Sequence, residues 1–366
     1  MRRRCVLWIV VCLSCGAFGQ ALDLPFTLTW AEGKCVGCKV AADLAGVQWV
    51  SRSEAWGIGF SFPPPGAQGA GDYVVVHTVD AGRSWRELPN TRQHAGPPAF
   101  SFLDASHGWF SCWNAYCTNE TPGLEVRRTT DAGKHWSVIT RATAVVAMAF
   151  SDERHAIAQE FGVDGTGGVV RTTDGGRTWS KIEIPHLKKI ESMIFLSGKT
   201  GWIADREGDD LLLFRTVNAG QSWEESRMSL PSEWPDVREI SFVDQNHGWI
   251  VLKHSQNDEI RLFATSDGGR VWLPVPLHPL RNDAWWSDVV RFVSDKVGFV
   301  FLTEDDDPQF RDLKRHNVLY TADGGARWQE YPLPYSVYSC QALGRDLICS
   351  ADQKDSHFGI LTLHPR

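Results

Sequence analysis

A turn motif that recurs six times constrains the fold of this chain more than any other feature of its sequence. Each copy has Thr, then Asp or Asn two residues later, Gly two residues after that, and Trp three residues further on. The acidic or amide positions are, in chain order, Asp80, Asp131, Asp174, Asn218, Asp267 and Asp323. The copies lie 43 to 56 residues apart, so the chain is predicted to consist of structural repeats.

The residue types of this motif indicate a hairpin turn. Asp and Asn side chains accept backbone N–H bonds within a tight turn, and the glycine supplies a positive φ. An apolar run such as residues 73–76 precedes the turn, which is typical of a strand entering a hairpin, and the Trp on the returning strand can pack against a neighbouring unit. We therefore interpret the repeated carboxylates as parts of turns, and not as catalytic or metal-binding groups.

A second periodic pattern lies between these turns, where an aromatic residue is followed seven positions later by another bulky apolar one. The pairs are Trp49/Trp56, Phe102/Trp109, Phe150/Ile157, Phe195/Trp202, Phe242/Trp249 and Phe292/Phe299, with a degenerate seventh at Cys340/Leu347. Polar turn residues separate the two members of each pair, which predicts a strand, a tight turn and a second strand. The first members are 45 to 53 residues apart.

Each repeat thus contains four short strands in about 40–50 residues, which is typical of a propeller blade. We predict an all-β fold, a single seven-bladed β-propeller of four-stranded blades. The seventh unit lacks the turn motif and ends with a strand over residues 357–364. We expect residues 25–31 to add the missing strand and so close the ring, leaving no long exposed edge.

The first 19 residues have the features of a signal peptide, which leaves residues 20–366 as the propeller domain. Arg2–Arg4 precede an apolar run over residues 5–15, and Ala17 and Gly19 form a small-x-small cleavage site. The alternative is lipid modification at Cys15. In both cases we expect a periplasmic or secreted protein, with no transmembrane segment once the signal is removed.

The charge of the mature chain argues against nucleic acid as a partner. Removing the three arginines of the signal lowers Lys+Arg from 37 to 34 against 44 Asp+Glu, a formal net charge of −10. An acidic protein is repelled by phosphate backbones.

Six cysteines remain after the signal, an even number that suggests disulfides in an exported chain. The simplest connectivity joins sequence neighbours, as Cys35/Cys38, Cys112/Cys117 and Cys340/Cys349. The Cys35/Cys38 pair could alternatively be a redox centre, although it has no βαβ context.

The six turns resemble the Asp-box, or bacterial neuraminidase, repeat. Together with the Phe and Gly-Trp strand pairs, residues 25–364 resemble the photosystem II stability/assembly-factor family of seven-bladed propellers. This resemblance implies an assembly chaperone or a scaffold that binds a partner. We expect a non-catalytic, monomeric protein that binds a protein partner or an extracytoplasmic polymer, without metal or cofactor.

Some enzymes also use Asp-box repeats, so a carbohydrate-binding protein or glycoside hydrolase is the alternative. Sialidases resemble this repeat, but their Arg-Ile-Pro motif is absent here. Glycoside hydrolysis requires two carboxylates across one cleft, which sequence spacing does not reveal.

Residues that depart from the repeat in the loops opposite the turns are the candidates for a binding site. The strongest group lies between the fifth and sixth units and contains Arg281, Asp283, Trp285 and Trp286. The other candidates are Trp234, His254 and Arg311. Aromatic and Arg side chains dominate binding hot spots, so these loops suit recognition of a peptide or glycan. The alternative for the two tryptophans is that they cap a blade interface.

Overall fold

The structure is a computed structural model that describes most of the chain after the first 23 residues. The described ranges are 24–39, 43–61, 71–94, 99–113, 124–140, 145–160, 168–188, 190–196, 199–230, 236–254, 260–277, 285–304, 316–353 and 357–366. Over these ranges the regular structure consists of strands, and none contains a helix long and apolar enough to cross a membrane.

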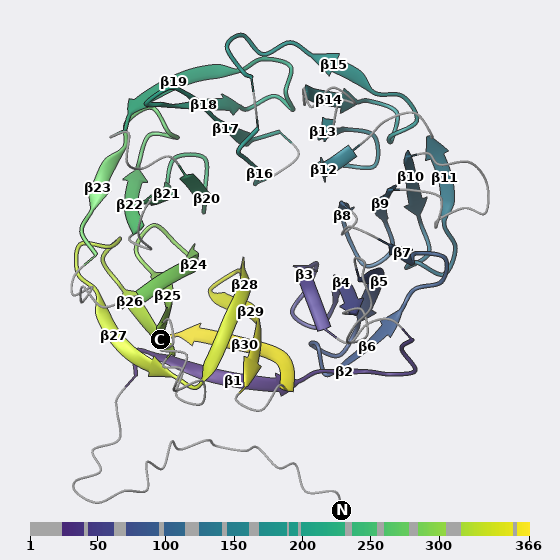
Figure 1. The fold of residues 1–366 in the computed structure, drawn as a ribbon, viewed down its shortest axis with the longest axis horizontal. Coiled ribbons are helices and arrows are strands. Elements are labelled where there is room, and N and C mark those ends of the chain that lie inside the picture. Colours follow the sequence, from purple (N-terminus) through teal and green to yellow (C-terminus); the bar gives the residue numbers. More distant parts are fainter. Residues whose placement is uncertain are drawn as a thin grey trace, which may run out of the picture.

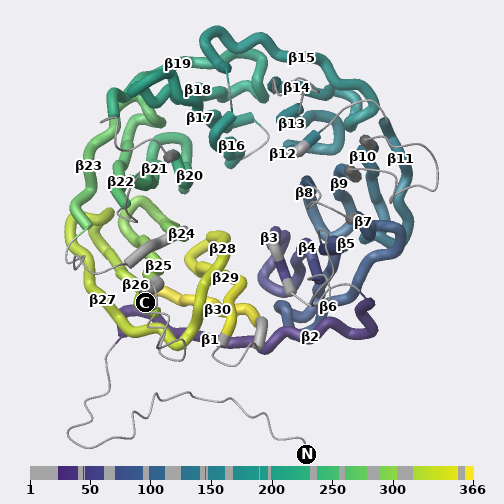
Figure 2. The backbone as a smooth tube through the Cα atoms, viewed as in Figure 1, coloured from purple at the N-terminus to yellow at the C-terminus, as the bar shows by residue number. Residues whose placement is uncertain are grey.

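The described strands form seven sheets arranged around a central axis (Figures 1 and 2). Each blade has a first strand nearest the axis and a last strand at the rim, apart from the closing blade described below. This arrangement confirms the predicted all-β, seven-bladed propeller.

The first three blades cover the N-terminal part of the ring. Blade 1 contains β3 (Asp43–Trp49), β4 (Ala55–Ser61), β5 (Asp72–Thr78) and β6 (Ser84–Glu87), to which β2 (Lys34–Cys35) and β7 (Gln93–His94) are added. Blade 2 contains β8 (Phe100–Phe102), β9 (Gly108–Trp113), β10 (Leu124–Thr129) and β11 (Ser137–Thr140). Blade 3 contains β12 (Val145–Phe150), β13 (Ala156–Glu160), β14 (Gly168–Thr172) and β15 (Ser180–Ile182).

The next three blades repeat the same order. Blade 4 contains β16 (Ser192–Phe195), β17 (Gly201–Glu207), β18 (Asp210–Thr216) and β19 (Glu224–Ser229). Blade 5 contains β20 (Asp236–Phe242), β21 (Gly248–Lys253), β22 (Ile260–Thr265) and β23 (Leu273–Val275). Blade 6 contains β24 (Trp285–Phe292), β25 (Gly298–Glu304), β26 (His316–Thr321) and β27 (Gln329–Leu333).

Blade 7 closes the ring with strands from both ends of the chain. It contains β28 (Tyr335–Leu343), β29 (Asp346–Gln353), β30 (His357–Pro365) and β1 (Phe26–Glu32). β1 pairs antiparallel with β30 over its whole length, from Phe26 opposite Pro365 to Glu32 opposite Gly359. The predicted closure by residues 25–31 is therefore confirmed. After β1 the chain continues to β2, which pairs with β6 of blade 1.

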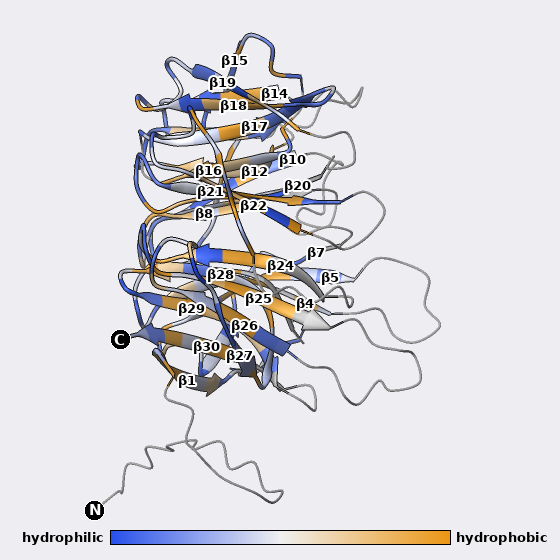
Figure 3. Cartoon of the chain, turned by 90° about the vertical axis from the view of Figure 1, so that its left-hand side faces the viewer, coloured by the Kyte–Doolittle hydropathy of each residue, from blue (hydrophilic) through white to orange (hydrophobic). Residues whose placement is uncertain are grey.

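The short hairpin turns lie together at one face of the ring, which we call the turn face. The connection between the first two strands of a blade contacts the connection between its last two, as where the Ala81 N–H donates to the Ser53 carbonyl at 2.8 Å. The same bond joins Gly268 to Asn246 in blade 5. In Figure 3 most connections at this face are hydrophilic, and the hydrophobic residues are concentrated in strands such as β17, β24 and β25. The opposite face, which contains the connections between blades, is the loop face.

The repeated carboxylates form the hydrogen bonds expected of turn residues. In blade 3, Thr172 Oγ1 donates to Asp174 Oδ1 at 2.8 Å and accepts the Gly176 N–H at 2.9 Å. Asp174 in turn accepts the backbone N–H and the hydroxyl of Thr178 at 2.9 and 2.6 Å. Gly176 has a φ of 91°, a conformation that only glycine adopts without strain. Equivalent Thr–Asp or Thr–Asn bonds occur in the other five copies.

Stacked aromatic rings join neighbouring blades. Trp109 on the second strand of blade 2 stacks on Phe150 of blade 3, with ring centroids 3.7 Å apart. The other stacks are Trp56 on Phe102, Trp202 on Phe242 and Trp249 on Phe292. A glycine precedes the Trp in blades 2, 4 and 5, and in blade 2 a Cβ at Gly108 would lie 2.0 Å from the Phe102 ring. The seven-residue spacing therefore specifies the contact between blades as well as the hairpin within a blade.

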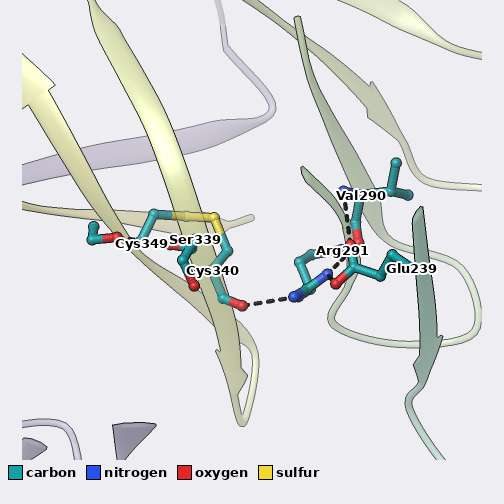
Figure 4. Close-up of a disulfide and its surroundings, with 7 residues drawn as sticks. Glu239, Val290, Arg291, Ser339, Cys340 and Cys349 are labelled. Atoms are coloured by element: carbon teal, nitrogen blue, oxygen red, sulfur yellow. Dashed lines mark hydrogen bonds and ion pairs between the residues drawn. A yellow bond between two sulfur atoms is a disulfide. The ribbon is translucent and has the colours of Figure 1, made fainter. Parts of the chain in front are cut away.

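Two of the predicted disulfides are present in the described residues. Cys35 and Cys38 are bonded just after β2, and Cys340 is bonded to Cys349 across the β28–β29 pair of blade 7 (Figure 4). The bond between Cys35 and Cys38 is compatible with a staple and with an oxidised redox pair, so its predicted role as a staple stays a prediction. Cys117 lies outside the described residues, so the predicted Cys112/Cys117 bond stays a prediction.

Candidate functional site

Three of the predicted binding residues are placed by the structure at one part of the loop face. The backbone of Trp285 and Trp286 begins β24, where these residues pair with Glu304 and Thr303 of β25. His254 directly follows β21 of the neighbouring blade 5. β24 begins and β21 ends at the same face, so the three residues belong to adjacent blades on that face. The side chains of Trp285 and Trp286 are not among the described ones.

The remaining candidates fall in loops outside the described residues. These are Trp234, Arg281, Asp283 and Arg311. Their proposed role in binding stays a prediction.

An ion pair and a hydrogen bond from the same arginine side chain hold β24 between its two neighbours on the inner wall of the ring. The Arg291 guanidinium of β24 is paired with Glu239 of β20, and its Nε donates to the Cys340 carbonyl of β28 at 2.8 Å (Figure 4). Arg291 Nη1 also donates to the Val290 carbonyl at 2.9 Å. One side chain thus links blades 5, 6 and 7. It lies on the strand that begins with the two candidate tryptophans.

Polar side chains make comparable links between other inner strands. The amide of Gln341 accepts the Trp49 N–H and donates to the Trp49 carbonyl, at 2.8 and 3.1 Å, joining blades 7 and 1. Gln48 makes the same double contact with the backbone of Phe102 in blade 2. These bonds fix the positions of the inner strands, and a rigid scaffold presents its loops with little ordering cost.

Asp174 and His77, two ionisable residues near the turn face, make contacts that stabilise the fold. Slight burial of Asp174 would raise its pKa, but the hydrogen bonds from Thr178 lower the pKa to about 2. His77 is buried, which lowers its pKa against the hydrogen bond and charge of Glu54, and its ring stacks on Trp56 at 4.0 Å. An ionised, fully hydrogen-bonded carboxylate is poorly suited to act as a general acid. Within the described residues, no three His, Cys, Asp or Glu side chains are grouped in a way that could hold a metal ion.

Sequence reasoning did not identify the link formed by Glu239, Arg291 and Cys340. Glu239 and Arg291 are in different repeats, and neither position departs from the strand pattern in a way that signals a partner. The sequence signal is weak: Arg291 is a charged residue between Val290 and Phe292, and Glu239 follows another charged residue, Arg238.

The fold and the arrangement of its faces define a seven-bladed β-propeller with a repeated turn on one side and the connections between blades on the other. No family model matches the chain. Among curated proteins, it resembles the photosystem II stability/assembly factor HCF136 of the Arabidopsis thaliana chloroplast, with 30% identity over 110 residues. That match covers 28% of this chain and 25% of the relative, so it spans about a quarter of the relative's length.

Solved structures of the same shape cover nearly the whole chain. A structure of YCF48 bound to D1 peptide matches with a TM-score of 0.60 and 17% identity, over 94% of this chain and 96% of that one. YCF48 from Cyanidioschyzon merolae matches with a TM-score of 0.58 and 14% identity, over 92% and 98% of the two chains. At these identities the likeness establishes the fold.

Proposed function

We propose that this protein is a non-catalytic scaffold that binds a protein partner on its loop face. The 110-residue similarity to a stability/assembly factor is the observation that carries the proposal. The fold shared with YCF48, whose structure was solved bound to D1 peptide, supports a peptide segment as the bound element. Binding on the loop face of the ring needs no catalytic group, in keeping with the structural use of the turn carboxylates.

We place the contact surface around the start of β24, at Trp285 and Trp286. These two residues lie at the loop end of a strand that Arg291 fixes to both neighbouring blades. A tryptophan pair on a fixed strand gives a large contact area at low ordering cost. We further propose that residues 1–19 direct the chain out of the cytoplasm, with the propeller acting in the periplasm or medium.

Affinity capture from envelope extracts of the native cell tests this function. The baits are the mature chain, a Trp285→Ala/Trp286→Ala variant, and a Val271→Ala variant, whose exposed side chain lies on the turn face. The proposal expects a protein captured by the first and third baits and lost from the second. Capture of the same proteins by all three baits, or of none, would contradict it and favour a screen for glycan binding or hydrolysis.

A further inference from the structure

Blade 3 lacks the tryptophan that fills the same position in four other blades. Trp56, Trp109, Trp202 and Trp249 occupy the second residue of the second strand, and Ile157 occupies it in blade 3. The ring on the next blade is nevertheless present, as Phe195 of β16. It packs over Gly201 just as Phe102 packs over Gly108. The stack between blades 3 and 4 therefore has one of its two rings.

The vacated space is a pocket at the turn face between the two blades. Its volume is about 60 Å³, and Ile157, Arg171, Phe195 and Ala219 are among its lining residues. About 10–15 Å³ is enough for one water molecule, so several fit. Phe195 is also more exposed than its four counterparts, Phe102, Phe150, Phe242 and Phe292, which are 1–8% exposed.

The pocket retains a backbone carbonyl that corresponds to the one bonded to the indole ring at two of the four equivalent positions. Trp109 Nε1 donates to the Gly175 carbonyl at 3.0 Å, and Trp202 Nε1 donates to the Gly268 carbonyl at 2.9 Å. Each acceptor is the residue after the Asp of the next blade's turn. In blade 4 that residue is Ala219, which lines the pocket.

A cationic side chain also lies where the ring would need it. Arg128 pairs with Trp109 across β9 and β10 and lies 5.0 Å from the centre of its ring. Arg171 pairs with Ile157 across β13 and β14 in the same way and lines the pocket. A guanidinium over an indole face is attractive, more so where water is excluded.

We propose that this pocket binds an indole ring supplied from outside the chain. The ring would stack on Phe195, donate its N–H to the Ala219 carbonyl, and lie beneath Arg171. The chain itself provides the template, since Trp109 makes all three contacts at the interface between blades 2 and 3. The ring can come from a free indole compound or from a Trp side chain of a peptide. The site is on the turn face and does not depend on the proposed loop-face function.

Fluorine NMR with 5-fluoroindole tests the proposal on the mature chain. We expect saturable binding to the wild type and affinity within about threefold for Ile157→Val, which leaves the pocket open. In Ile157→Trp the chain fills its own pocket, and affinity is expected to fall at least tenfold. Ala149→Leu, which adds bulk to another lining residue, gives the same loss if Ile157→Trp does not fold. Absence of binding to the wild type, or equal binding to both filled variants, would overturn the proposal.

A comparison of ligands separates the two sources of the ring. If a Trp side chain can enter the pocket, N-acetyl-tryptophanamide and a Gly-Gly-Trp-Gly-Gly peptide should both displace bound 5-fluoroindole. If only free indole competes, the pocket takes a small aromatic molecule. Displacement by the matched Gly-Gly-Leu-Gly-Gly peptide at equal concentration would show non-specific apolar binding and contradict the indole site.

Discussion

Trp202 and Phe242 stack face to face across the boundary between blades 4 and 5, with ring centroids 3.5 Å apart and planes 6° from parallel. Both rings are buried, and Trp202 Nε1 also donates to the Gly268 carbonyl in the turn of blade 5. One side chain therefore joins its blade to both the inner strand and the turn of the next. Repeat proteins derive much of their stability from such neighbour contacts.

The first prediction concerns this stack. Trp202→Ala removes a fully buried ring and a hydrogen bond, and should lower the free energy of unfolding by about 3–5 kcal/mol. Val271→Ala, at an exposed position on the turn face, should change it by less than about 0.5 kcal/mol. Equilibrium unfolding in urea measures both. A loss below about 1 kcal/mol for Trp202→Ala would show that the stack is not a main contact between blades.

The second prediction concerns the pH dependence of the turns. The pKa of Asp174 is about 2 in the folded protein against an ordinary value of 3.8, so its contribution to stability is complete above pH 3.8 and is lost as the pH falls toward 2. Asp174→Asn should keep the turn, as Asn218 does with its bonds to Thr216 and Ser222.

The measurement is the urea midpoint of wild type and Asp174→Asn between pH 7 and pH 2. The wild type should be the more stable at pH 7, and the difference should shrink below pH 3.8. Asp174→Ala, which removes both acceptors, should cost about 1 kcal/mol at pH 7. If the difference in urea midpoint between wild type and Asp174→Asn instead grows as the pH falls, ionised Asp174 does not stabilise the turn.

The third prediction concerns an alanine in a left-handed conformation. Ala81 has a φ of 61°, where blade 3 has glycine at the equivalent position 175 with a φ of 78°. Ala81→Gly should therefore raise the free energy of unfolding by roughly 0.5–1 kcal/mol, since the strain removed exceeds the extra entropy of the unfolded chain. Ala158→Gly, in the middle of β13, is the control and should be destabilising. Thermal unfolding of both variants decides the sign.

The fourth prediction concerns ring closure by β1. A chain that begins at residue 24 keeps this strand, whereas one that begins at residue 34 loses its pairing with β30 and the Phe26 ring, which lies 5.6 Å from Phe299. The shorter chain should lose at least about 3–5 kcal/mol and tend to associate through the exposed edge of β30. Urea unfolding and gel filtration compare the two. Equal free energies of unfolding for the two chains would mean that the pairing of β1 with β30 does not stabilise the ring.

The repeat pattern contains enough information to predict the fold. Thr172, Asp174 and Gly176 form a turn through local bonds, and the spacing of Phe102 from Trp109 places one ring on each strand of a hairpin. These contacts depend on near neighbours in sequence, so the residues themselves indicate them.

Polar links and pockets between blades are harder to predict than the aromatic stacks. Arg291 joins Glu239 and Cys340, which belong to repeats on either side, and nothing local to any of the three indicates the others. At Ile157 the sequence shows the missing tryptophan, but only the structure shows that Phe195 stays in place and leaves a pocket. The candidate binding residues of the loops depart from the repeat, so the repeat provides no template for the partners proposed for them.

The most direct test of partner binding on the loop face is site-specific photo-crosslinking in the native envelope. A photoreactive phenylalanine is placed at position 286, at the start of β24, and in a matched chain at position 271 on the turn face. Binding on the loop face predicts a discrete crosslinked protein from position 286 and none from position 271. A protein crosslinked equally from both positions, or from 271 alone, would contradict it.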